Sequence, residues 1–281
     1  NGYAMKFTDL DLHPQILKGL KDMSHEDLTP IQEATIPHIL AGKDVMGLAE
    51  TGSGKTGACG IPLVQICDSK VREIQALILV PTRELAQQYV SEIANIARYT
   101  NIAPFAMFGG FDMDIQRAKL KDGVQILVAT PGRLIDYLWN NAMPLDQVRT
   151  MVLDEADEML KMGFVENVDF IMSCLMHEHQ TLMFSATMPK EVERLSKSYL
   201  KDPIRSELIK GQSAPQSLNH HFQVIRHSDR LKMLEEYLKE EEIGQAIIFC
   251  NSRANGSRLI RELKRMLPSV DYIHGGLEQS Q

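Results

Sequence analysis

Several features that define other protein classes are missing from this 281-residue sequence. It has no run of about 18 apolar residues, which excludes a membrane-spanning helix. Residues 1–5 lack the basic and apolar regions of a secretion signal. The four cysteines show no metal-ligand spacing and lie in apolar surroundings, so we expect buried thiols in a reducing compartment: Cys59, Cys67, Cys174 and Cys250. These absences predict a cytoplasmic protein.

An excess of positive charge is also lacking. The formal net charge is −7 at pH 7, which argues against non-specific nucleic-acid binding through overall electrostatics. A local phosphate site, built from backbone amides and a few arginines, is still compatible with this charge. The apolar fraction of 44% and the charged fraction of 24% are typical of a soluble globular chain with one large domain or two ordinary ones.

The chain is organised around one glycine-rich stretch between an apolar run (45–48) and a further apolar segment (58–66). This order predicts a strand, a tight loop and a helix, in which backbone N–H groups and the helix N-terminus can hold a phosphate chain. Lys55 would then reach the β- and γ-phosphates and Thr56 would bind Mg²⁺. The alternative is a glycine-rich turn with a helix cap. The loop residues are Ala49, Glu50, Thr51, Gly52, Ser53, Gly54, Lys55 and Thr56.

Short apolar strands alternate with helical patterns along the first 210 residues, which predicts an α/β fold with a doubly wound parallel sheet. A polar linker at 211–217 and a second, incomplete unit at 218–281 follow. The expected strands are 44–48, 76–80, 104–108, 125–129, 150–153, 181–184 and 204–209, with 219–225, 246–250 and 272–274 in the second unit. The second unit's expected helices are 230–240 and 253–267.

Acidic residues follow the apolar strand at 150–153. A carboxylate at a strand end, near a phosphate loop, can hold Mg²⁺ through its waters, which we assign to Asp154. Its neighbour Glu155 can orient or deprotonate an attacking water. Alone, such residues are more often a solvated helix start. The phosphate loop upstream favours the acid site.

The order of these segments resembles that of a DEAD-box RNA helicase of superfamily 2, over nearly the whole chain. Asp154-Glu155-Ala156-Asp157, the loop with its alanine, and Ser185-Ala186-Thr187 carry the likeness. The resemblance implies a RecA-like fold of the P-loop NTPase class, ATP and Mg²⁺ as cofactors, RNA as partner and RNA-stimulated ATP hydrolysis. The catalytic residues that it implies are Lys55, Asp154, Glu155, Asp157, Ser185 and Thr187.

Further segments resemble the RNA-contacting parts of this family. Threonines after strands can cap helices whose first turns offer N–H groups to phosphates, and such contacts fix register without reading sequence. Each segment alone is more often an ordinary strand-to-helix turn with a good cap. The implied RNA-binding residues are Pro81, Thr82, Arg83, Gly109, Gly110, Thr130, Pro131, Gly132 and Arg133, with Asn251 and Arg253 in the second unit. A truncated segment, His274-Gly275-Gly276 through Gln279, also resembles the family.

The resemblance assigns adenine recognition to Phe7, Thr29 and Gln32, because the Gln32 amide has the acceptor and donors that adenine's edge requires. This segment departs from the family at Ser24-His25, where a glycine and an aromatic are usual, and at Leu28, where proline is usual. Phe7 fits a core aromatic equally well.

Family members close a second domain over ATP and supply arginines from it, in segments that normally lie beyond Gln281. The chain is therefore expected to be catalytically impaired. Two alternatives to the helicase hypothesis stay open. One is a non-catalytic ATP- and RNA-binding clamp or regulatory fragment, and the other is a nucleotide-driven motor acting on DNA.

Overall fold

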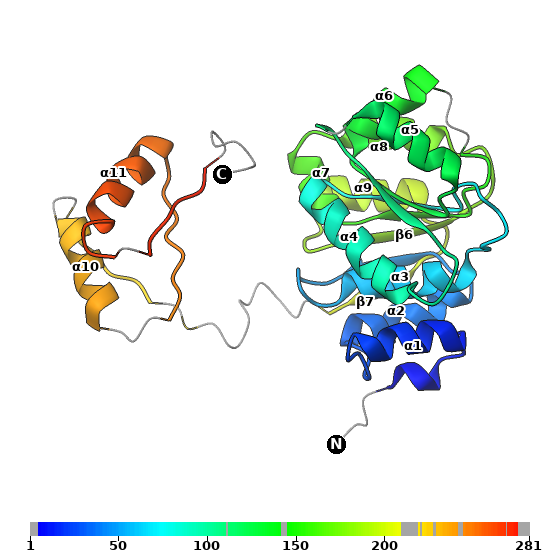
Figure 1. Cartoon of the computed structure of the whole chain (residues 1–281), viewed down its shortest axis with the longest axis horizontal. Helices are drawn as coiled ribbons and strands as arrows, with labels where there is room; N and C mark the ends of the chain where they lie inside the picture. Colours follow the sequence, from blue (N-terminus) through cyan, green and yellow to red (C-terminus); the bar gives the residue numbers. More distant parts are fainter. Residues whose placement is uncertain are drawn as a thin grey trace. The chain divides into compact units, whose positions relative to one another are not determined.

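The computed structural model describes residues 5–110, 112–141, 145–208, 219, 221–226, 229–240, 244–267 and 269–274. The chain divides into two compact units, Asn1–Ser213 and Ala214–Gln281 (Figure 1). The predicted linker at 211–217, and the residues after His274, lie outside the described part of the chain. Within the described part, no helix is both long enough and apolar enough to cross a membrane.

The first unit is built on a seven-stranded, all-parallel sheet with the strand order β3-β4-β2-β5-β6-β1-β7. The predicted parallel α/β sheet is confirmed, and each strand expected for this unit forms with its ends shifted by at most two residues. The strands are β1 (Val45–Leu48), β2 (Ala76–Leu79), β3 (Pro104–Met107), β4 (Ile126–Ala129), β5 (Thr150–Leu153), β6 (Gln180–Ser185) and β7 (Ile204–Glu207).

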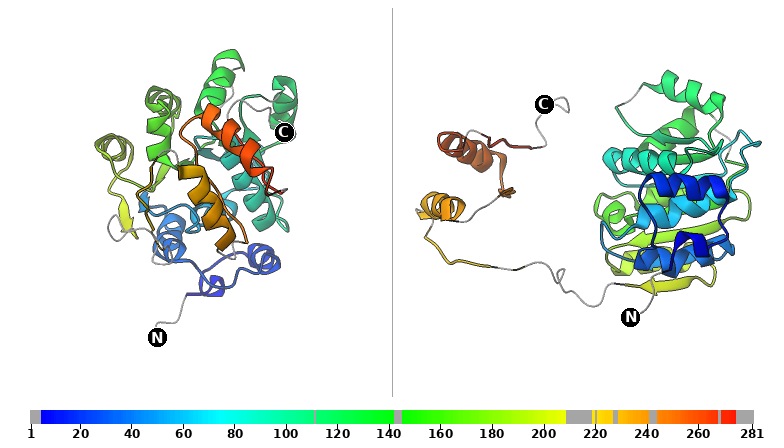
Figure 2. Two further views of the ribbon diagram at one scale, coloured as in Figure 1. Left: turned by 90° about the vertical axis from the view of Figure 1, so that its left-hand side faces the viewer. Right: turned by 60° about the horizontal axis from the view of Figure 1, so that its bottom comes forward.

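Helices cover both faces of this sheet (Figures 1 and 2). Because side chains alternate along a strand, Ala76 and Ile78 of β2 pack with α1–α4, whereas Leu77 and Leu79 pack with α6–α9. The N-terminal helices are η1 (Phe7–Asp9), α1 (Pro14–Asp22), α2 (Pro30–Leu40), α3 (Lys55–Ile66) and α4 (Arg83–Ile96). The others are α5 (Met113–Asp122), α6 (Pro131–Asn141), α7 (Ala156–Lys161), α8 (Val165–Ser173) and α9 (Lys190–Tyr199).

The second unit contains the two predicted helices, α10 (Arg230–Glu240) and α11 (Arg253–Leu263), the latter four residues shorter than predicted. The strand predictions are wrong here, because none of the described residues at 219–226, 245–250 and 271–274 belongs to a hydrogen-bonded ladder. Most of their apolar side chains are exposed to solvent, although Ile225 and Tyr272 are half-buried. Phe222 is 95% exposed, Phe249 93% and Ile273 97%. A strand is stabilised by its partners and by burial of its faces, and these segments have neither.

The cysteine prediction holds only in part. Cys59 is buried, Cys67 and Cys174 are half-buried, and Cys250 is exposed. Burial raises the pKa of the Cys67 thiol to about 12, so this group stays protonated. Cys250 contradicts the prediction because it belongs to the segment at 245–250 that no sheet covers.

Candidate functional site

Three polar loops meet at one edge of the first unit because the strands that precede them are neighbours. β6 lies between β5 and β1 in the sheet, and all three strands are parallel. The backbone N–H of Ala49, after β1, donates to the carbonyl oxygen of Ser185, at the end of β6, over 3.1 Å. The N–H of Asp157, after β5, donates to the Ser185 hydroxyl over 3.3 Å. The predicted phosphate loop, acidic segment and Ser185-Ala186-Thr187 are therefore one site.

The phosphate loop requires glycine at the position that opens α3. Gly54 is the N-cap of this helix and has a left-handed backbone with φ of 97°. A Cβ atom there would lie 2.6 Å from the Thr29 hydroxyl oxygen and 2.9 Å from Nε2 of Gln32, so a side chain is excluded by both conformation and space. The loop therefore brings backbone close to whatever occupies the site, and the first N–H groups of α3 follow directly.

Buried polar atoms at this loop lack partners within the described structure. Lys55 is 5% exposed, and its Nζ makes no hydrogen bond although it lies 3.8 Å from Oδ1 of Asp154. The hydroxyl oxygens of Ser53 and Thr29 are also buried without a hydrogen-bond partner among the described residues. Such groups are costly to bury unless something satisfies them. An ammonium, hydroxyls and backbone N–H groups together suit a polyanion such as a phosphate chain.

The acidic segment presents two carboxylates in different environments. Asp154 is 2% exposed, and its Oδ1 accepts a 2.8 Å hydrogen bond from the N–H of Glu155. Glu155 is half-buried and has a left-handed backbone, with φ of 50° and ψ of 48°. Burial raises the pKa of the Glu155 carboxyl, and the charge of Asp154 raises it further. A carboxylate with a raised pKa is a stronger base for a proton from water.

The side chain of Tyr89 is part of this site, and the sequence did not indicate it. Its hydroxyl donates a 2.5 Å hydrogen bond to Oδ2 of Asp154. On the apolar face of α4 it has the pattern of an ordinary core residue. The one indication in the sequence is the hydroxyl group itself, because a buried tyrosine hydroxyl usually has a hydrogen-bond partner.

Ser185 and Thr187 connect β6 to the acidic segment. The Thr187 hydroxyl donates to Oδ2 of Asp157 over 2.6 Å, and the Ser185 hydroxyl donates to the Thr187 carbonyl oxygen over 2.7 Å. Burial raises the pKa of Asp157, but hydrogen bonds from Thr187, Ser185 and the Ala186 backbone outweigh it and hold this pKa below its ordinary value. Asp157 thus stays ionised and anchors the segment.

The residues assigned to adenine recognition divide between two places. The Gln32 carbonyl oxygen accepts the Thr29 N–H over 3.0 Å, and its amide donates to the Gly54 carbonyl oxygen over 3.1 Å. Thr29 occupies the N-cap position of α2, and Pro30 is the first residue of this helix. Gln32 is 5% exposed. Because its oxygen bonds to the N-cap of α2 and its nitrogen to the phosphate loop, its side-chain amide lies between α2 and this loop. Gln32 and Thr29 therefore fix this loop to the start of α2.

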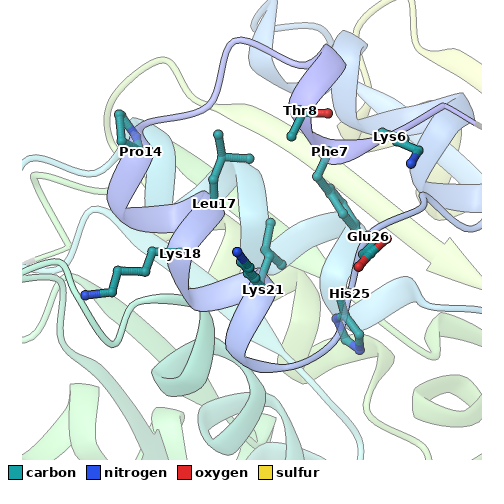
Figure 3. Close-up of a pocket in the computed structure, with 10 residues that line it drawn as sticks. Lys6, Phe7, Thr8, Pro14, Leu17, Lys18, Lys21, His25 and Glu26 are labelled. Carbon is teal, nitrogen blue, oxygen red and sulfur yellow. The ribbon is translucent and has the colours of Figure 1, made fainter.

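Phe7 lines a cavity of about 550 Å³ formed by η1, α1 and the loop after α1 (Figure 3). The ring is 3% exposed and packs in the core, so the core interpretation is confirmed, while the ring also forms a wall of the cavity. His25 and Glu26 lie on the facing loop, and Lys18 and Lys21 project from α1. The family departures Ser24 and His25 are both exposed, and Leu28 is buried in the core.

The predicted RNA-contacting segments follow β2, β3 and β4, which are neighbours in the other half of the sheet. The Thr82 hydroxyl caps α4 by accepting the Leu85 N–H over 3.2 Å, as predicted. Nε of Arg83 donates to Glu84 over 2.8 Å, and Nε of Arg133 donates to the Gln116 side chain over 3.5 Å. Pro81 and Pro131 are buried, Thr130 and Gly132 half-buried, and Gly109 and Gly110 exposed. Asn251 and Arg253 are exposed in the second unit.

A divalent cation would depend on a ligand for most of its coordination. Within the described residues no group of three or more His, Cys, Asp or Glu side chains could hold a metal ion. Asp154 and the Thr56 hydroxyl are nevertheless oxygen donors at the loop where phosphates would lie. Mg²⁺ in proteins is usually held by one or two carboxylates together with substrate phosphates and waters. The donor set therefore fits Mg²⁺ that enters with a nucleotide.

Comparisons with known proteins agree on one family. The family profile described as DEAD/DEAH box helicase matches residues 29–195. The ATP-dependent RNA helicase DbpA of Bacillus subtilis (strain 168) is 37% identical over 273 residues, which are 97% of this chain and 57% of that protein. The ATP-dependent RNA helicase DeaD of Escherichia coli (strain K12) is 36% identical over 279 residues, 99% of this chain and 44% of that protein.

Among solved structures, a DEAD box protein from the hyperthermophile Methanococcus jannaschii matches with a TM-score of 0.70 and 33% sequence identity, over 99% of this chain and 75% of that chain. This match and the parallel sheet show the predicted RecA-like α/β fold. The chain spans about half the length of the curated relatives that it matches. Since the family profile covers more than half of the residues, the chain belongs to the DEAD/DEAH box helicase family.

Proposed function

We propose that this chain is part of an ATP-dependent RNA helicase, in which ATP binding and hydrolysis drive local RNA duplex unwinding or remodelling of RNA–protein complexes. One observation supports this most directly. The buried Lys55 ammonium, without a hydrogen-bond partner in the described structure, lies 3.8 Å from the buried Asp154 carboxylate at the phosphate loop. The names of the relatives, ATP-dependent RNA helicases, point the same way.

In this proposal the loop at 49–56 holds the triphosphate of ATP. Lys55 directs its ammonium at the β- and γ-phosphates, and the N–H groups that open α3 donate to phosphate oxygens. Thr56 and Asp154 would hold Mg²⁺, which neutralises charge on the phosphate oxygens when it is bound. Glu155 orients the attacking water and accepts its proton, because burial has raised the pKa of its carboxyl.

The RNA backbone would lie along the ends of β2, β3 and β4. Thr82 and Thr130 stand where α4 and α6 begin, so N–H groups of these first turns can donate to phosphates, with Arg83 and Arg133 beside them. Exposed Gly109 and Gly110 allow a ribose to come close. Contacts to phosphate and sugar position RNA without reading its sequence, and the 2′-hydroxyl distinguishes it from DNA.

Coupling between the two halves would run through β6. Ser185 contacts both the phosphate loop, through the Ala49 N–H, and the acidic segment, through the Asp157 N–H. Thr187 binds the Asp157 carboxylate. These hydrogen bonds connect residues 185–187 directly to the phosphate loop and the acidic segment. A shift of either one when the γ-phosphate is cleaved can therefore move residues 185–187, which supports their assigned role in linking hydrolysis to strand separation.

The test measures ATP binding and ATP hydrolysis by the chain with Mg²⁺, in the absence and presence of RNA. Lys55→Ala is expected to weaken ATP binding by about 10- to 100-fold, the effect of removing one charge-assisted hydrogen bond. Glu155→Gln should keep ATP binding and abolish RNA-stimulated hydrolysis. Lys197→Ala is the matched control, because this lysine lies on α9 in an exposed ion pair with Glu193. Unchanged ATP affinity in Lys55→Ala would contradict the proposal.

The same assay separates the alternatives. ATP and RNA binding with a hydrolysis rate that RNA does not raise would support the non-catalytic clamp. Equal stimulation by an RNA and by a DNA of the same sequence would support a DNA-directed motor. The predicted catalytic impairment of this chain and its cytoplasmic location stay predictions.

A further inference from the structure

Tyr89, which belongs to none of the site segments assigned from the sequence, holds one oxygen of the acidic site. Tyr89 lies on α4 and is completely buried. Its hydroxyl donates a 2.5 Å hydrogen bond to Oδ2 of Asp154, a residue 65 positions later in the sequence. The apolar part of the ring belongs to the core between the sheet and α1–α4. Only its polar end reaches the site.

This contact fixes the orientation of a carboxylate that would otherwise be held on one side only. Oδ1 of Asp154 accepts the N–H of Glu155 over 2.8 Å and lies 3.8 Å from Nζ of Lys55. Oδ2 is held by Tyr89. With a partner at each oxygen, the carboxylate plane is set before any ligand arrives. Outer partners of this kind orient the carboxylates that hold metals, and their loss usually weakens metal binding by 10- to 100-fold.

The surroundings keep the Tyr89 hydroxyl a donor. A phenol hydroxyl is protonated at neutral pH, and an ionised carboxylate can only accept hydrogen bonds, so Tyr89 is the donor in its 2.5 Å contact with Oδ2 of Asp154. On its other side the hydroxyl oxygen is 3.9 Å from the buried Cys59 Sγ, a weak partner. The strong interaction of this hydroxyl is therefore the one with Asp154.

We propose that Tyr89 is a positioning residue of the nucleotide site, whose hydroxyl orients the Asp154 carboxylate toward Mg²⁺ bound to the triphosphate. This inference rests on the proposed function, since it requires that Asp154 meets Mg²⁺. It assigns to Tyr89 an effect on the magnesium dependence of nucleotide binding and none on the contacts that the loop at 49–56 makes to phosphates.

The test is carried out on the full 281-residue chain with a fluorescent ATP analogue as the probe. Its affinity is measured in EDTA and across a series of Mg²⁺ concentrations. In Tyr89→Phe, which removes only the hydroxyl oxygen, the Mg²⁺ concentration that gives half of the tightening is expected to rise about tenfold. The affinity in EDTA should be unchanged. The affinity in EDTA and the Mg²⁺ concentration for half of the tightening are measured on the same sample of each variant. A difference between variants in the fraction of folded protein therefore does not alter the comparison of these two values.

Two comparisons make the result specific. Tyr99→Phe is the matched control, because the Tyr99 hydroxyl also donates a 2.5 Å hydrogen bond to a carboxylate, that of Asp22, away from the site. It should leave the magnesium dependence unchanged. In the Asp154→Asn background, Tyr89→Phe should add no further change, since it acts through Asp154. Tyr89→Met, which keeps an apolar side chain without a donor, is the second variant and should behave as Tyr89→Phe does.

The outcomes separate the two proposals. If Mg²⁺ does not tighten binding even in the parent chain, the proposed function fails. If it does, and both Tyr89 variants respond at the same Mg²⁺ concentration as the parent and Tyr99→Phe, the role of Tyr89 is overturned. Equal weakening in EDTA and in Mg²⁺ would also overturn it, because that result indicates a purely structural tyrosine.

Discussion

The two units of this chain contain similar strand-like sequences with opposite outcomes. In the first unit, Thr150–Leu153 forms β5 between β2 and β6, and all four residues are buried. In the second unit, the segment at 246–250 is equally rich in apolar residues but belongs to no ladder. Ile247 is 76% exposed and Phe249 93%. The difference lies in what surrounds each segment and not in its composition.

This contrast shows that an apolar run becomes a strand only when other elements supply hydrogen-bond partners and cover its faces. β5 has a strand on each side and helices on both faces of the sheet. The described residues of the second unit offer two helices, α10 and α11, with Ile260 and Leu263 as their buried apolar residues. Strand propensity measures the fit to a half-buried pleated surface, and among the described residues that surface exists in the first unit alone.

The largest expected effect is the loss of stability when a buried phenylalanine is truncated in the first unit but not when an exposed one is truncated in the second. Phe184→Ala should reduce the free energy of unfolding of the first unit by about 3–5 kcal/mol. Phe184 is fully buried in β6, and its ring contacts the neighbouring strand β1 at Gly47. Unfolding by urea can be followed through Trp139, the single tryptophan, which lies on α6 in edge contact with Phe170.

The matched substitution in the second unit is Phe249→Ala. It should change the free energy of unfolding of the second unit, followed by the circular dichroism of its helices, by less than about 0.5 kcal/mol, because surface substitutions rarely do more. A loss as large as that of Phe184→Ala would break the comparison. It would show that the segment at 246–250 is packed in solution and not exposed.

A smaller loss of stability is expected when a hydrogen bond between residues far apart in the sequence of the first unit is removed. It should still exceed the loss from removing an ion pair between near neighbours in the second unit. Thr187→Val removes the donor that, with Ser185, lowers the pKa of Asp157. A lowered folded-state pKa stabilises the protein above the unfolded value of 3.8, and this stability is lost as the pH falls through the folded value. At pH 7 the variant should therefore lose about 1 kcal/mol, at the low end for a charged partner because Thr187 is exposed.

The loss in Thr187→Val should shrink below about pH 4, where Asp157 becomes protonated in the unfolded chain. Urea titrations at pH 7, 5 and 3.5 measure it. In the second unit, Arg265→Ala breaks an exposed pair between residues three apart, Arg265 and Glu262, and should cost less than about 0.5 kcal/mol at any of these values. A constant loss in Thr187→Val at all three pH values would show that Asp157 is not responsible.

The sequence predicted those parts of the fold and site that depend on local pattern. Thr82 was expected to cap a helix, and its hydroxyl accepts the N–H of Leu85 in the first turn of α4. The apolar run at 150–153 was expected to be a strand, and β5 has the same bounds. Such features are set by residues within a few positions of one another, so they are visible without a structure.

Features that depend on distant residues were not predictable. Tyr89 has the spacing of a core residue, and only the folded sheet brings Asp154 to its hydroxyl. The hydrogen bond from the Gln32 amide to the carbonyl oxygen of Gly54, 22 positions later in the phosphate loop, was not predicted either, and the role of Gln32 in adenine recognition stays a prediction. The strands of the second unit failed for the same reason, because partners and cover cannot be read from a single run of residues.

The smallest expected effect concerns backbone strain, which persists only where surrounding contacts enforce it. Among the described residues, left-handed non-glycine residues occur in the first unit alone, at Ser24, Glu155 and Asp202. Ser24 ends α1 in a Schellman motif, in which its N–H donates to the Lys21 carbonyl oxygen and the His25 N–H to that of Leu20. Glycine suits this position because it lacks the Cβ atom that makes the left-handed conformation costly.

Ser24→Gly should therefore relieve roughly 1 kcal/mol of backbone strain while it adds somewhat less in unfolded-state entropy. The expected gain is about 0.5 kcal/mol, or a melting temperature about 1–2 °C higher for a unit of this size. Calorimetry can resolve this shift, and Ser24→Ala, which keeps the Cβ atom, is the control that should show no gain. A destabilised Ser24→Gly would mean that the serine side chain, and not the packing around α1, holds the turn. That result would weaken the contrast between the first unit, which is rigid enough to hold strained residues, and the second unit, whose described residues include none.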